Sequence, residues 1–484
     1  MIPLQYRLRD GVRVEEGPGG AWRVVSELPI AVLTVNASAA RLLELTRSGI
    51  AVTKLAGELG LAEEKILALC ERLRSRGVLE VAPVPVDRTY EPSVTIIIPT
   101  RDRAGDLADC LDALGRLDYP REKLEVIVVD DASLEPGAVA EVASRCGARL
   151  LANEQNHGPA YSRNRAAREA RGELLAFIDS DCVAGETWLR ELAGYFAWSR
   201  VGAVGGRTLG YYTESPLDRY EEVASSLDMG AHLRVEAGGS DTFYVPTCNL
   251  LVRGAVYAEL GGLREDQRVG EDVDFCWRLR DAGHYLIYTP QGVVRHKHRT
   301  TLSAMMRQRA SYGTSEAKLY DEHRDKRKRL PLTPAPMATA ALVSAALVAR
   351  KPRLLAAGLA PLALDVARRM SHLQEHGVDI PTRRVAFSVL RAHLSMLYFV
   401  YFHLVRYYLA PLAAAGLLAP GAWLLMSVAV LYAAAVDYAV KKPRLSFPVY
   451  LGYYLAEHGA YQMGVVLGCL RAGTWRSYAV GRAT

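Results

Sequence analysis

Three apolar runs in the middle of the chain, each ending in acidic residues, constrain the fold more than any other feature. The runs cover residues 94–99, 124–129 and 174–178. Continuous apolar runs of this length are typical of strands buried on both faces of a parallel sheet. Helical patterns lie between them, over residues 105–116, 137–145 and 159–171. Strands that alternate with helices predict an α/β fold with a mostly parallel sheet.

Carboxylates follow each of the three predicted strands. Asp102 comes after the first, Asp130 and Asp131 end the second, and Asp179 and Asp181 end the third. Ligands of open α/β sheets bind beyond the carboxyl ends of the strands. Acids that share such an edge repel one another unless a cation or hydrogen-bond donors balance them. Because Mg²⁺ and Mn²⁺ prefer oxygen ligands and bridge carboxylates to phosphates, we expect one of these ions and a phosphorylated ligand here.

A series of motifs in this region resembles glycosyltransferase family 2, the inverting nucleotide-sugar transferases with the GT-A fold. The matching motifs are IPT at 98–100, VVDDAS at 128–133, NHGPAYSRN at 156–164, RGE at 171–173, FIDSD at 177–181, GG at 261–262 and GEDVDFCWR at 270–278. They occur in the order of the family and span nearly all of residues 93–300. A D-x-D tripeptide alone is common by chance, whereas its place after an apolar strand within this series is specific.

The resemblance implies roles for individual residues. Donor-binding residues would be Thr100, Asp102, Asp130, Arg163 and Asp179. Metal ligands would be Asp179, Asp181 and His296, with His298 competing for the place of His296. Asp272 would be the general base that takes the proton of the acceptor hydroxyl. The metal would neutralise the charge that grows on the departing diphosphate.

Each of these residues also has a structural interpretation when taken alone. Asp102 and Asp130 are residue types that end strands or cap helices. Arg163 fits a surface ion pair, and an acid such as Asp272 favours a helix N-terminus through the helix dipole. A single histidine such as His296 is often structural. The functional interpretation therefore depends on the whole series of motifs.

Residues 1–85 have the pattern of a small winged-helix domain. Strand-like runs at 6–14 and 22–26 precede a helix that starts near Asn36, and two further helices are predicted at 52–59 and 62–76. A strand at 78–81 and a linker at 81–86 follow. With 11 Lys/Arg against 10 Asp/Glu, a net charge of +1, this region lacks the charge expected of a nucleic-acid-binding domain.

The same region resembles the PqqD-like peptide-recognition modules. The resemblance implies that an extended peptide adds to a strand edge, for which the runs at 6–14 and 22–26 are the candidates. The alternative is a domain that only braces the rest of the chain.

The composition changes after residue 329. Residues 330–349 and 407–436 carry no charge, and a bilayer crossing takes about 20 residues. We expect a helical, membrane-associated region, and a soluble helical bundle is the alternative. The basic run at 324–329 predicts that the catalytic region faces the cytosol. An N-terminus without an apolar segment predicts no signal peptide, and seven cysteines without a C-x-x-C pair fit a reducing compartment.

We therefore predict three domains, at 1–85, 92–329 and 330–484. Their order resembles the glycosyltransferases of mycofactocin biosynthesis. That family implies transfer of a hexose, with UDP-glucose as the donor, onto a peptide-derived redox cofactor precursor at the cytoplasmic face of the membrane. One alternative is a membrane synthase that makes a cell-surface glycan. Another is a non-catalytic membrane scaffold that binds a peptide partner. The element RQR at 307–309 lacks the tryptophan of processive synthases, which argues against long-chain synthesis.

Overall fold

The computed structural model describes residues 4–17, 20–27, 30–82, 86–239, 241–326, 328–330 and 333–482. The chain divides into two compact units. The sheet unit comprises residues 85–328 and 438–480, and the module unit comprises residues 1–84, 329–437 and 481–484. Residues 83–85 of the predicted linker, and residue 327 of the basic run, lie outside the described residues. The prediction of three separate domains stays a prediction.

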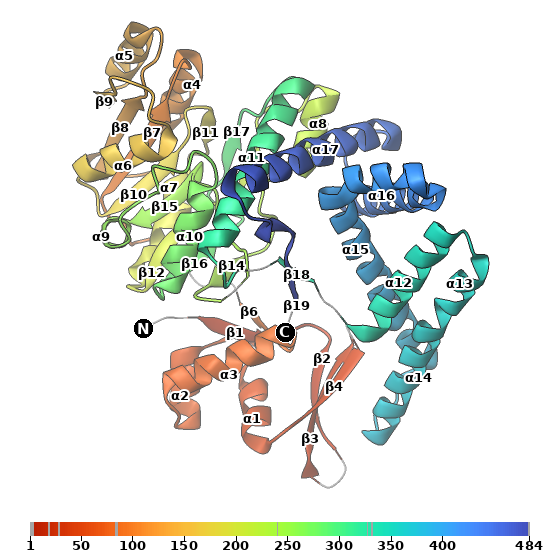
Figure 1. Ribbon diagram of the computed structural model, residues 1–484. Coiled ribbons are helices and arrows are strands. Elements are labelled where there is room, and N and C mark those ends of the chain that lie inside the picture. The colour runs from red at the N-terminus through yellow and green to blue at the C-terminus, as the bar shows by residue number, and fades with distance from the viewer. Residues whose placement is uncertain are drawn as a thin grey trace. The chain divides into compact units, whose positions relative to one another are not determined.

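A large mixed sheet forms the centre of the sheet unit (Figure 1). Its strands, in spatial order, are β14 (Arg234–Glu236), β16 (Tyr285–Tyr288), β12 (Val201–Gly205), β15 (Asn249–Arg253), β10 (Leu174–Ile178), β7 (Val94–Thr100), β8 (Leu124–Asp130) and β9 (Arg149–Ala152). The half from β10 to β9 is parallel, as predicted for β10, β7 and β8; strand β9 is an addition to the predicted strands. Strand β15 runs antiparallel to both of its neighbours, so the sheet as a whole is mixed.

Helices connect the parallel strands where the sequence predicted them. They are α4 (Ala104–Leu114), α5 (Pro136–Arg145) and α6 (Pro159–Glu169). Further helices of the unit are α7 (Trp188–Ala193), α8 (Pro216–Ala224), α9 (Gly254–Glu259) and α10 (Glu271–Asp281). Apolar side chains of these helices and of the sheet form the core, in which Ile97, Phe177 and Phe275 are fully buried. The fold is a GT-A-like mixed α/β sheet, and the carboxyl ends of β7, β8 and β10 lie side by side.

A second, small sheet lies next to the end of β10. It consists of β11 (Cys182–Ala184), β17 (Val294–His296) and β13 (Thr208–Gly210), in that order. Strand β11 begins directly after Asp181, and it pairs antiparallel with β17 so that Cys182 faces His296. This pairing brings residues that are more than 100 positions apart in the sequence to the same strand end.

Two long helices complete the sheet unit. Helix α11 (Leu302–Glu322) and helix α17 (Phe447–Ala472) lie side by side (Figure 1). They approach closely because Gly464 of α17 has no side chain: an added Cβ would lie 1.9 Å from the carbonyl oxygen of Ala310. A short helix, η4 (Arg476–Tyr478), follows α17.

The N-terminal part of the module unit contains two small antiparallel sheets and three helices. The strands are β1 (Gln5–Leu8), β2 (Val12–Glu16), β3 (Trp22–Glu27), β4 (Ile30–Val35), β5 (Ile50–Ala51) and β6 (Leu79–Val81). The helices are α1 (Ala37–Leu45), α2 (Val52–Leu59) and α3 (Glu63–Ser75), close to their predicted positions. Helix α1 begins next to Asn36, as predicted. Asn36 caps it, because its side chain accepts a hydrogen bond from the amide of Ala39 at 2.9 Å.

The strands of this part correct two expectations. The run at 6–14 is two strands, because the chain turns at Gly11, whose φ of +80° is easily reached only by glycine. Strand β1 is the central strand of the sheet β5-β1-β6, and β3 is the central strand of β2-β3-β4. Both lie between two partners, so neither offers the free edge that the prediction required. Of the predicted runs, only β2 is an edge strand.

The C-terminal part of the module unit is helical. Its helices are α12 (Pro334–Ala349), α13 (Pro352–Ala357), α14 (Leu359–Glu375), α15 (Thr382–Leu418) and α16 (Pro420–Lys441). Helix α12 has 16 residues, fewer than a bilayer crossing requires. The uncharged run at 407–436 is not one span, because the chain breaks between α15 and α16 at Ala419 and Pro420.

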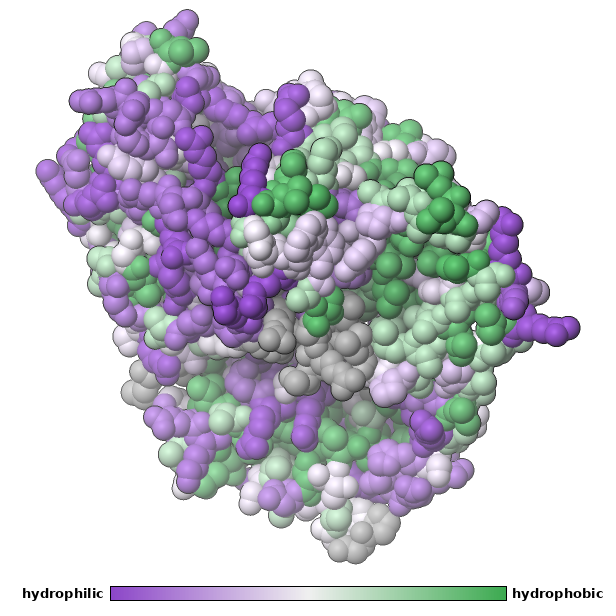
Figure 2. Space-filling view, in the orientation of Figure 1, coloured by the Kyte–Doolittle hydropathy of each residue, from purple (hydrophilic) through white to green (hydrophobic). Residues whose placement is uncertain are grey.

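Two helices in the described part of the chain are long and apolar enough to cross a membrane: α15 and α16. Figure 2 shows hydrophobic, green surface over the C-terminal helices and largely hydrophilic, purple surface over the strands and helices of the large sheet. Their identification as candidate spans rests on length and composition, a test that the core helix of a soluble protein also passes.

Candidate active site

The ends of β7 and β8 bring three of the predicted donor residues together. Thr100 and Asp130 are register partners at the ends of these neighbouring parallel strands, and both are buried. Ser133 links Asp130 to Asp102. Its hydroxyl donates a hydrogen bond to Asp130 Oδ1 at 2.5 Å and accepts one from the amide of Asp102 at 2.9 Å. The hydroxyl of Thr100 has no hydrogen-bond partner among the described residues, although it is buried.

The backbone of these two loops adopts an unusual conformation. Asp102 has a φ of +55° and Ala132 a φ of +60°. Residues other than glycine seldom occupy this region, and such strain concentrates at binding sites. Asp102 is held there by the amide of Leu134, which donates to its Oδ1 at 2.7 Å. The neighbouring Asp131 has a structural role, since it accepts hydrogen bonds from the amides of His157 and Gly158 before α6.

Arg163 connects the end of β10 to the start of α10. Its Nη2 donates to Asp179 Oδ1 at 2.5 Å, and its Nη1 donates to Glu271 Oε1 at 3.0 Å. The Arg163 side chain is only 3% exposed. Burial alone would lower the pKa of Arg163, but the carboxylates of Asp179 and Glu271 outweigh it and raise that pKa. The sequence predicted that Arg163 lies near the donor; here its guanidinium is held by two carboxylates of the protein.

Asp272 lies in the first turn of α10, beside Glu271. Gly270 precedes this turn with a φ of +81°, and a Cβ there would meet Leu319 and Ser315 of α11 at 3.0 and 3.1 Å. The chain can therefore enter the helix tightly against α11. The N-terminal end of a helix favours negative charge, which helps two adjacent acids to coexist.

The surroundings make both acids of α10 weaker than usual. Burial raises the pKa of Glu271 to about 7, and the neighbouring charge of Asp272 adds to this effect. Burial also raises the pKa of Asp272, although the backbone amides of Val273 and Thr247 partly oppose the rise. A carboxyl group with a raised pKa is a stronger proton acceptor once it is ionised, as a general base requires.

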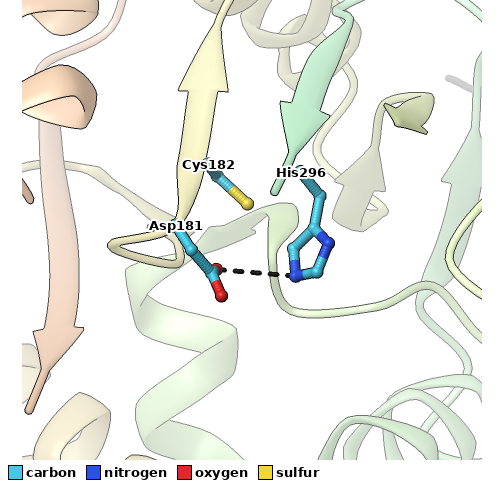
Figure 3. Close-up of side chains that lie close together, drawn as sticks. All are labelled: Asp181, Cys182 and His296. Carbon is cyan, nitrogen blue, oxygen red and sulfur yellow. Dashed lines mark ion pairs between the residues drawn. The ribbon is translucent and has the colours of Figure 1, made fainter. Parts of the chain in front are cut away.

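Asp181 directly precedes β11 and faces His296 of β17 (Figure 3). Asp181 Oδ1 lies 3.5 Å from His296 Nε2. Cys182 points into the same space, and the three side chains offer ligand atoms that all lie within 4.8 Å of one another. Arg103 also contacts this group, because its Nη1 donates to Asp181 Oδ2 at 2.5 Å. Positive charge thus already balances the carboxylate that the sequence assigned to a cation.

The alternative histidine, His298, lies in a different environment. Its Nε2 is 3.1 Å from Asp218 Oδ1, and both side chains are buried. Burial alone would raise the pKa of Asp218, but hydrogen bonds from Ser215 and His298 outweigh it and lower that pKa. Of the two histidines, His296 is therefore the one beside Asp181. Its assignment as a metal ligand stays a prediction.

Three residues of the site were not singled out from the sequence. Glu271 was noted only as the neighbour of Asp272, Cys182 only as part of the cysteine count, and Arg103 was not considered. Cys182 and His296 meet only because β11 and β17 pair, and no local pattern predicts a pairing across 114 positions. Arg103 follows Asp102 directly, so a search for cations at strand ends would have found it.

Part of the chain is similar to known proteins. Residues 95–259 match the family described as Glycosyl transferase family 2. The Pre-mycofactocin glycosyltransferase of Mycobacterium tuberculosis is 35% identical over 246 residues, which are 50% of this chain and 51% of that protein. The glycosyltransferase AglE of Haloferax volcanii is 27% identical over 213 residues, which are 43% of this chain and 68% of that protein.

The solved structures that resemble the chain do so more distantly. A mannosyltransferase from Pyrobaculum calidifontis, in complex with GDP-Man and Mn²⁺, has 22% identity and a TM-score of 0.40, and the alignment covers 80% of this chain and 96% of that one. The aligned region spans about half the length of the Mycobacterium tuberculosis relative. Residues 95–259, which contain the D-x-D end of β10 and the ends of β7 and β8, are therefore similar to glycosyl transferase family 2.

Proposed function

We propose that the chain is a metal-dependent inverting glycosyltransferase that moves a hexose from a nucleotide sugar to an acceptor hydroxyl. The observation that carries this proposal is the link through Arg163, which holds the D-x-D carboxylate Asp179 and the start of α10 together. The buried Arg163 side chain would thereby hold Asp179, on the donor side, close to the first turn of α10, on the acceptor side.

The donor side uses the strand ends of β7 and β8. Thr100, Asp102 and Asp130 would bind the nucleoside. The unsatisfied hydroxyl of Thr100 and the strained backbone of Asp102 support this assignment, because both are costly unless a ligand uses them. Asp179 is 31% exposed on its side chain, so its second oxygen remains accessible while the first binds Arg163.

The residues around Asp181 fit a divalent cation. An oxygen of Asp181 and a nitrogen of His296 converge. A carboxylate oxygen is the ligand type that Mg²⁺ and Mn²⁺ prefer, and of the two ions Mn²⁺ is the one that also binds an imidazole nitrogen. Asp181, Asp179 and His296 would hold the ion. When bound, it would supply positive charge where the leaving diphosphate becomes more negative. With the metal ion bound, the charge of the Asp181 carboxylate would be balanced without Arg103. The Arg103 side chain would then be free to contact the phosphate oxygens of the donor.

The acceptor side uses Asp272 as the general base. Inversion takes place in one displacement, in which the acceptor oxygen attacks the anomeric carbon, the bond to the diphosphate breaks and the hydroxyl proton passes to Asp272. Arg163 would hold Glu271 and so fix the first turn of α10 in which Asp272 stands. The alcohol is a far weaker acid than the carboxyl group, so the proton must leave during the attack, and close positioning of Asp272 is required.

We propose that the acceptor is pre-mycofactocin, as a peptide-derived redox cofactor precursor, and that the hexose is glucose from UDP-glucose. The name of the relative from Mycobacterium tuberculosis, half of whose length is matched, supports the acceptor assignment. Residues 1–85 would be the PqqD-like winged-helix domain that recognises the peptide, before a catalytic domain at 92–329 and a helical region at 330–484. The element order α1-β5-α2-α3-β6, with β1 between β5 and β6, supports the winged-helix assignment.

We also propose that α15 and α16 attach the chain to the cytoplasmic face of the membrane. Both are long and apolar enough to cross a bilayer. Tyr398 of α15 donates a hydrogen bond to Asp437 of α16 at 2.6 Å, so a polar group near the end of α16 is satisfied within the helix pair. The cytoplasm is also where nucleotide sugars are made.

The test is a donor screen with purified full-length protein, Mn²⁺ or Mg²⁺ and candidate acceptors, read by mass spectrometry. We expect the mass of one or more hexoses to be added to a peptide-derived acceptor from UDP-glucose, and we expect EDTA to abolish the addition. Transfer only to a lipid-linked or polymeric glycan would contradict the acceptor assignment. Unchanged turnover in EDTA would contradict the metal. A protein that neither transfers nor hydrolyses any donor would instead be a scaffold.

A further inference from the structure

Helix α17 buries polar side chains and exposes apolar ones, the opposite of a surface helix in a water-soluble protein. Its polar residues Glu457, His458 and Gln462 are buried. Its exposed large side chains are apolar: Val449, Leu455, Met463, Leu467 and Leu470. Soluble surface helices show the opposite arrangement, with the apolar stripe facing the core.

The buried polar face of α17 is matched by partners on two neighbouring helices. Tyr220 of α8 donates to Glu457 Oε2 at 2.7 Å, and Arg309 of α11 places its Nε 3.7 Å from Glu457 Oε1. Arg309 also pairs with both oxygens of Glu221. These contacts satisfy charges that would otherwise be costly to bury, so the inward orientation of Glu457 is stable.

Close packing also prevents α17 from rotating about its axis. Gly464 and Gly468 lie against the backbone of α11, and an added Cβ would meet the carbonyl oxygens of Ala310 and Thr314 at 1.9 and 2.4 Å. Any rotation would drive a larger side chain into that backbone. The apolar row is therefore held outward.

The outward row is long and carries no charge. From Phe447 to Leu470, Glu457 is the only Asp, Glu, Lys or Arg, and it points inward. The row from Val449 to Leu470 extends about 32 Å at 1.5 Å per residue. Exposed apolar side chains gathered along one face of a helix are characteristic of an interaction site.

We propose that α17 lies in the plane of a membrane interface, with this row inserted among the acyl chains of an anionic bilayer. Basic residues flank the row at both ends, with Lys442 before it and Arg471 after it, both exposed. Trp475, 56% exposed, follows the helix, and tryptophan is enriched at the level of the lipid head groups. The two helices long enough to span a membrane directly precede α17 in the chain. Amphipathic helices with such features bind in the interface plane.

Helix α17 lies along the membrane and does not cross it, because of the helix that it packs against. Helix α11 carries Arg307, Lys318 and Asp321, and it belongs to the same unit as the active site. A crossing α17 would carry these charges into the hydrocarbon, at a cost of several kcal/mol. Helix α17 is also absent from the helices that meet the length and hydropathy of a span in the described part of the chain.

This contact would fix the height of the active site above the bilayer. Helix α11 rests on α17 on one side and on Gly270, two residues before Asp272, on the other. The binding itself does not require glycosyl transfer, so it is tested without any substrate.

The experiment places an environment-sensitive fluorophore at position 463 through Met463→Cys, in a full-length Cys146→Ser background that leaves only buried native cysteines. Leu134→Cys in the same background is the matched control, because Leu134 is an exposed apolar residue of the same unit, 84% exposed. The labelled proteins are reconstituted with vesicles of phosphatidylcholine and phosphatidylglycerol. Quenching is measured with nitroxide-bearing lipids and with aqueous iodide, after circular dichroism confirms the fold.

We expect the label at position 463 to be quenched by the nitroxide lipids and protected from iodide, and the label at position 134 to show the reverse. Iodide quenching at position 463 equal to that of the control would overturn the proposal. Protection from iodide without nitroxide quenching would also overturn it, since protein, such as a second copy of the chain, would then cover the row.

Discussion

At the scale of single residues, the site depends on how few cations balance its acids. Asp179 and Asp181 lie at the end of β10, and Glu271 and Asp272 lie at the start of α10. The buried cation Arg163 pairs with Asp179 and Glu271, and Arg103 pairs with Asp181. A buried ion pair contributes little net stability, but removing one partner leaves the other charges without compensation. Arg163 is therefore both a structural and a positioning residue.

Arg163→Gln should lower the free energy of unfolding by about 3–5 kcal/mol, because it leaves Glu271 and Asp179 without their donor. Urea unfolding measures this loss. The control is Arg163→Gln combined with Glu271→Gln, which removes one of the stranded charges and should recover part of the loss. A single variant as stable as the wild type would show that Arg163 is not needed to hold these acids.

The raised pKa of Asp272 predicts the pH dependence of transfer. The base must be ionised, so the rate should fall as the pH drops through the pKa of Asp272 in the folded protein. Because that pKa is raised, the fall should begin above the usual range of an aspartate, near 4. Glu271→Gln removes a neighbouring negative charge and should move the fall to lower pH. A kcat that stays constant from pH 8 down to about 4 would contradict the raised pKa.

At the scale of elements, the sequence predicted the helices and strands that are defined by local residue patterns. The parallel strands β7, β8 and β10 and the helices α2 to α6 agree within a few residues, because apolar runs, caps and glycines define them. The antiparallel insertion of β15 and the pairing of β11 with β17 depend on contacts between distant segments. The break at Ala419 lies in the uncharged run of 30 residues, where Pro411, Gly416, Pro420 and Gly421 indicate a kink but do not fix its position.

In the candidate site, too, local patterns could be predicted from the sequence and contacts between distant segments could not. Asp179 and Asp181 were predictable because each follows an apolar strand, and parallel strands end at one edge. The contact of Arg163 with Glu271 spans 108 positions and joins two helices, so no spacing rule predicts it. The strand-edge prediction failed for β3 because a strand pattern does not tell whether one or two partners flank it.

The packing of α17 on α11 gives a test at this scale. Gly464→Ala places a Cβ 1.9 Å from the backbone of Ala310, whereas Gly452→Ala on the same helix meets nothing within 4 Å. We expect Gly464→Ala to lower the free energy of unfolding by about 1–3 kcal/mol through overpacking. Gly452→Ala should be neutral or stabilising by up to about 1 kcal/mol, because alanine favours helices. Equal effects of the two variants in a thermal melt would show that the helices are not in close contact.

At the scale of the whole molecule, the two ends of the module unit share one core. Val25, Ile30 and Val32 of the N-terminal sheet pack with Leu373 and with other apolar residues of α14 and α15. The amide of Ile30 also donates to Ser388 of α15 at 3.3 Å. Sequence reasoning assigned these segments to separate domains, since nothing local connects positions more than 340 residues apart.

Deletion of residues 1–85 should therefore destabilise the C-terminal helices as well as remove the N-terminal domain. Ile30→Ala is the milder version, with an expected loss of about 2–5 kcal/mol because Ile30 is buried in the shared core. Differential scanning calorimetry of both proteins measures the effect. A deletion protein whose remaining chain melts at the wild-type temperature would show that the shared core contributes nothing.

The central claim is that the residues around Asp181 and Asp272 form one glycosyl-transfer site, and the variant that tests it most directly is Asp272→Asn. This change keeps the shape of the side chain and removes the proton acceptor. Asp281→Asn is the control, because Asp281 lies at the exposed end of the same helix.

The measurement is hexose transfer by mass spectrometry together with donor binding by calorimetry, both on the full-length protein. We predict that Asp272→Asn binds the nucleotide sugar as the wild type does while its kcat falls by about 10²-fold or more, and that Asp281→Asn is unchanged in both. Near-normal turnover of Asp272→Asn would contradict the account.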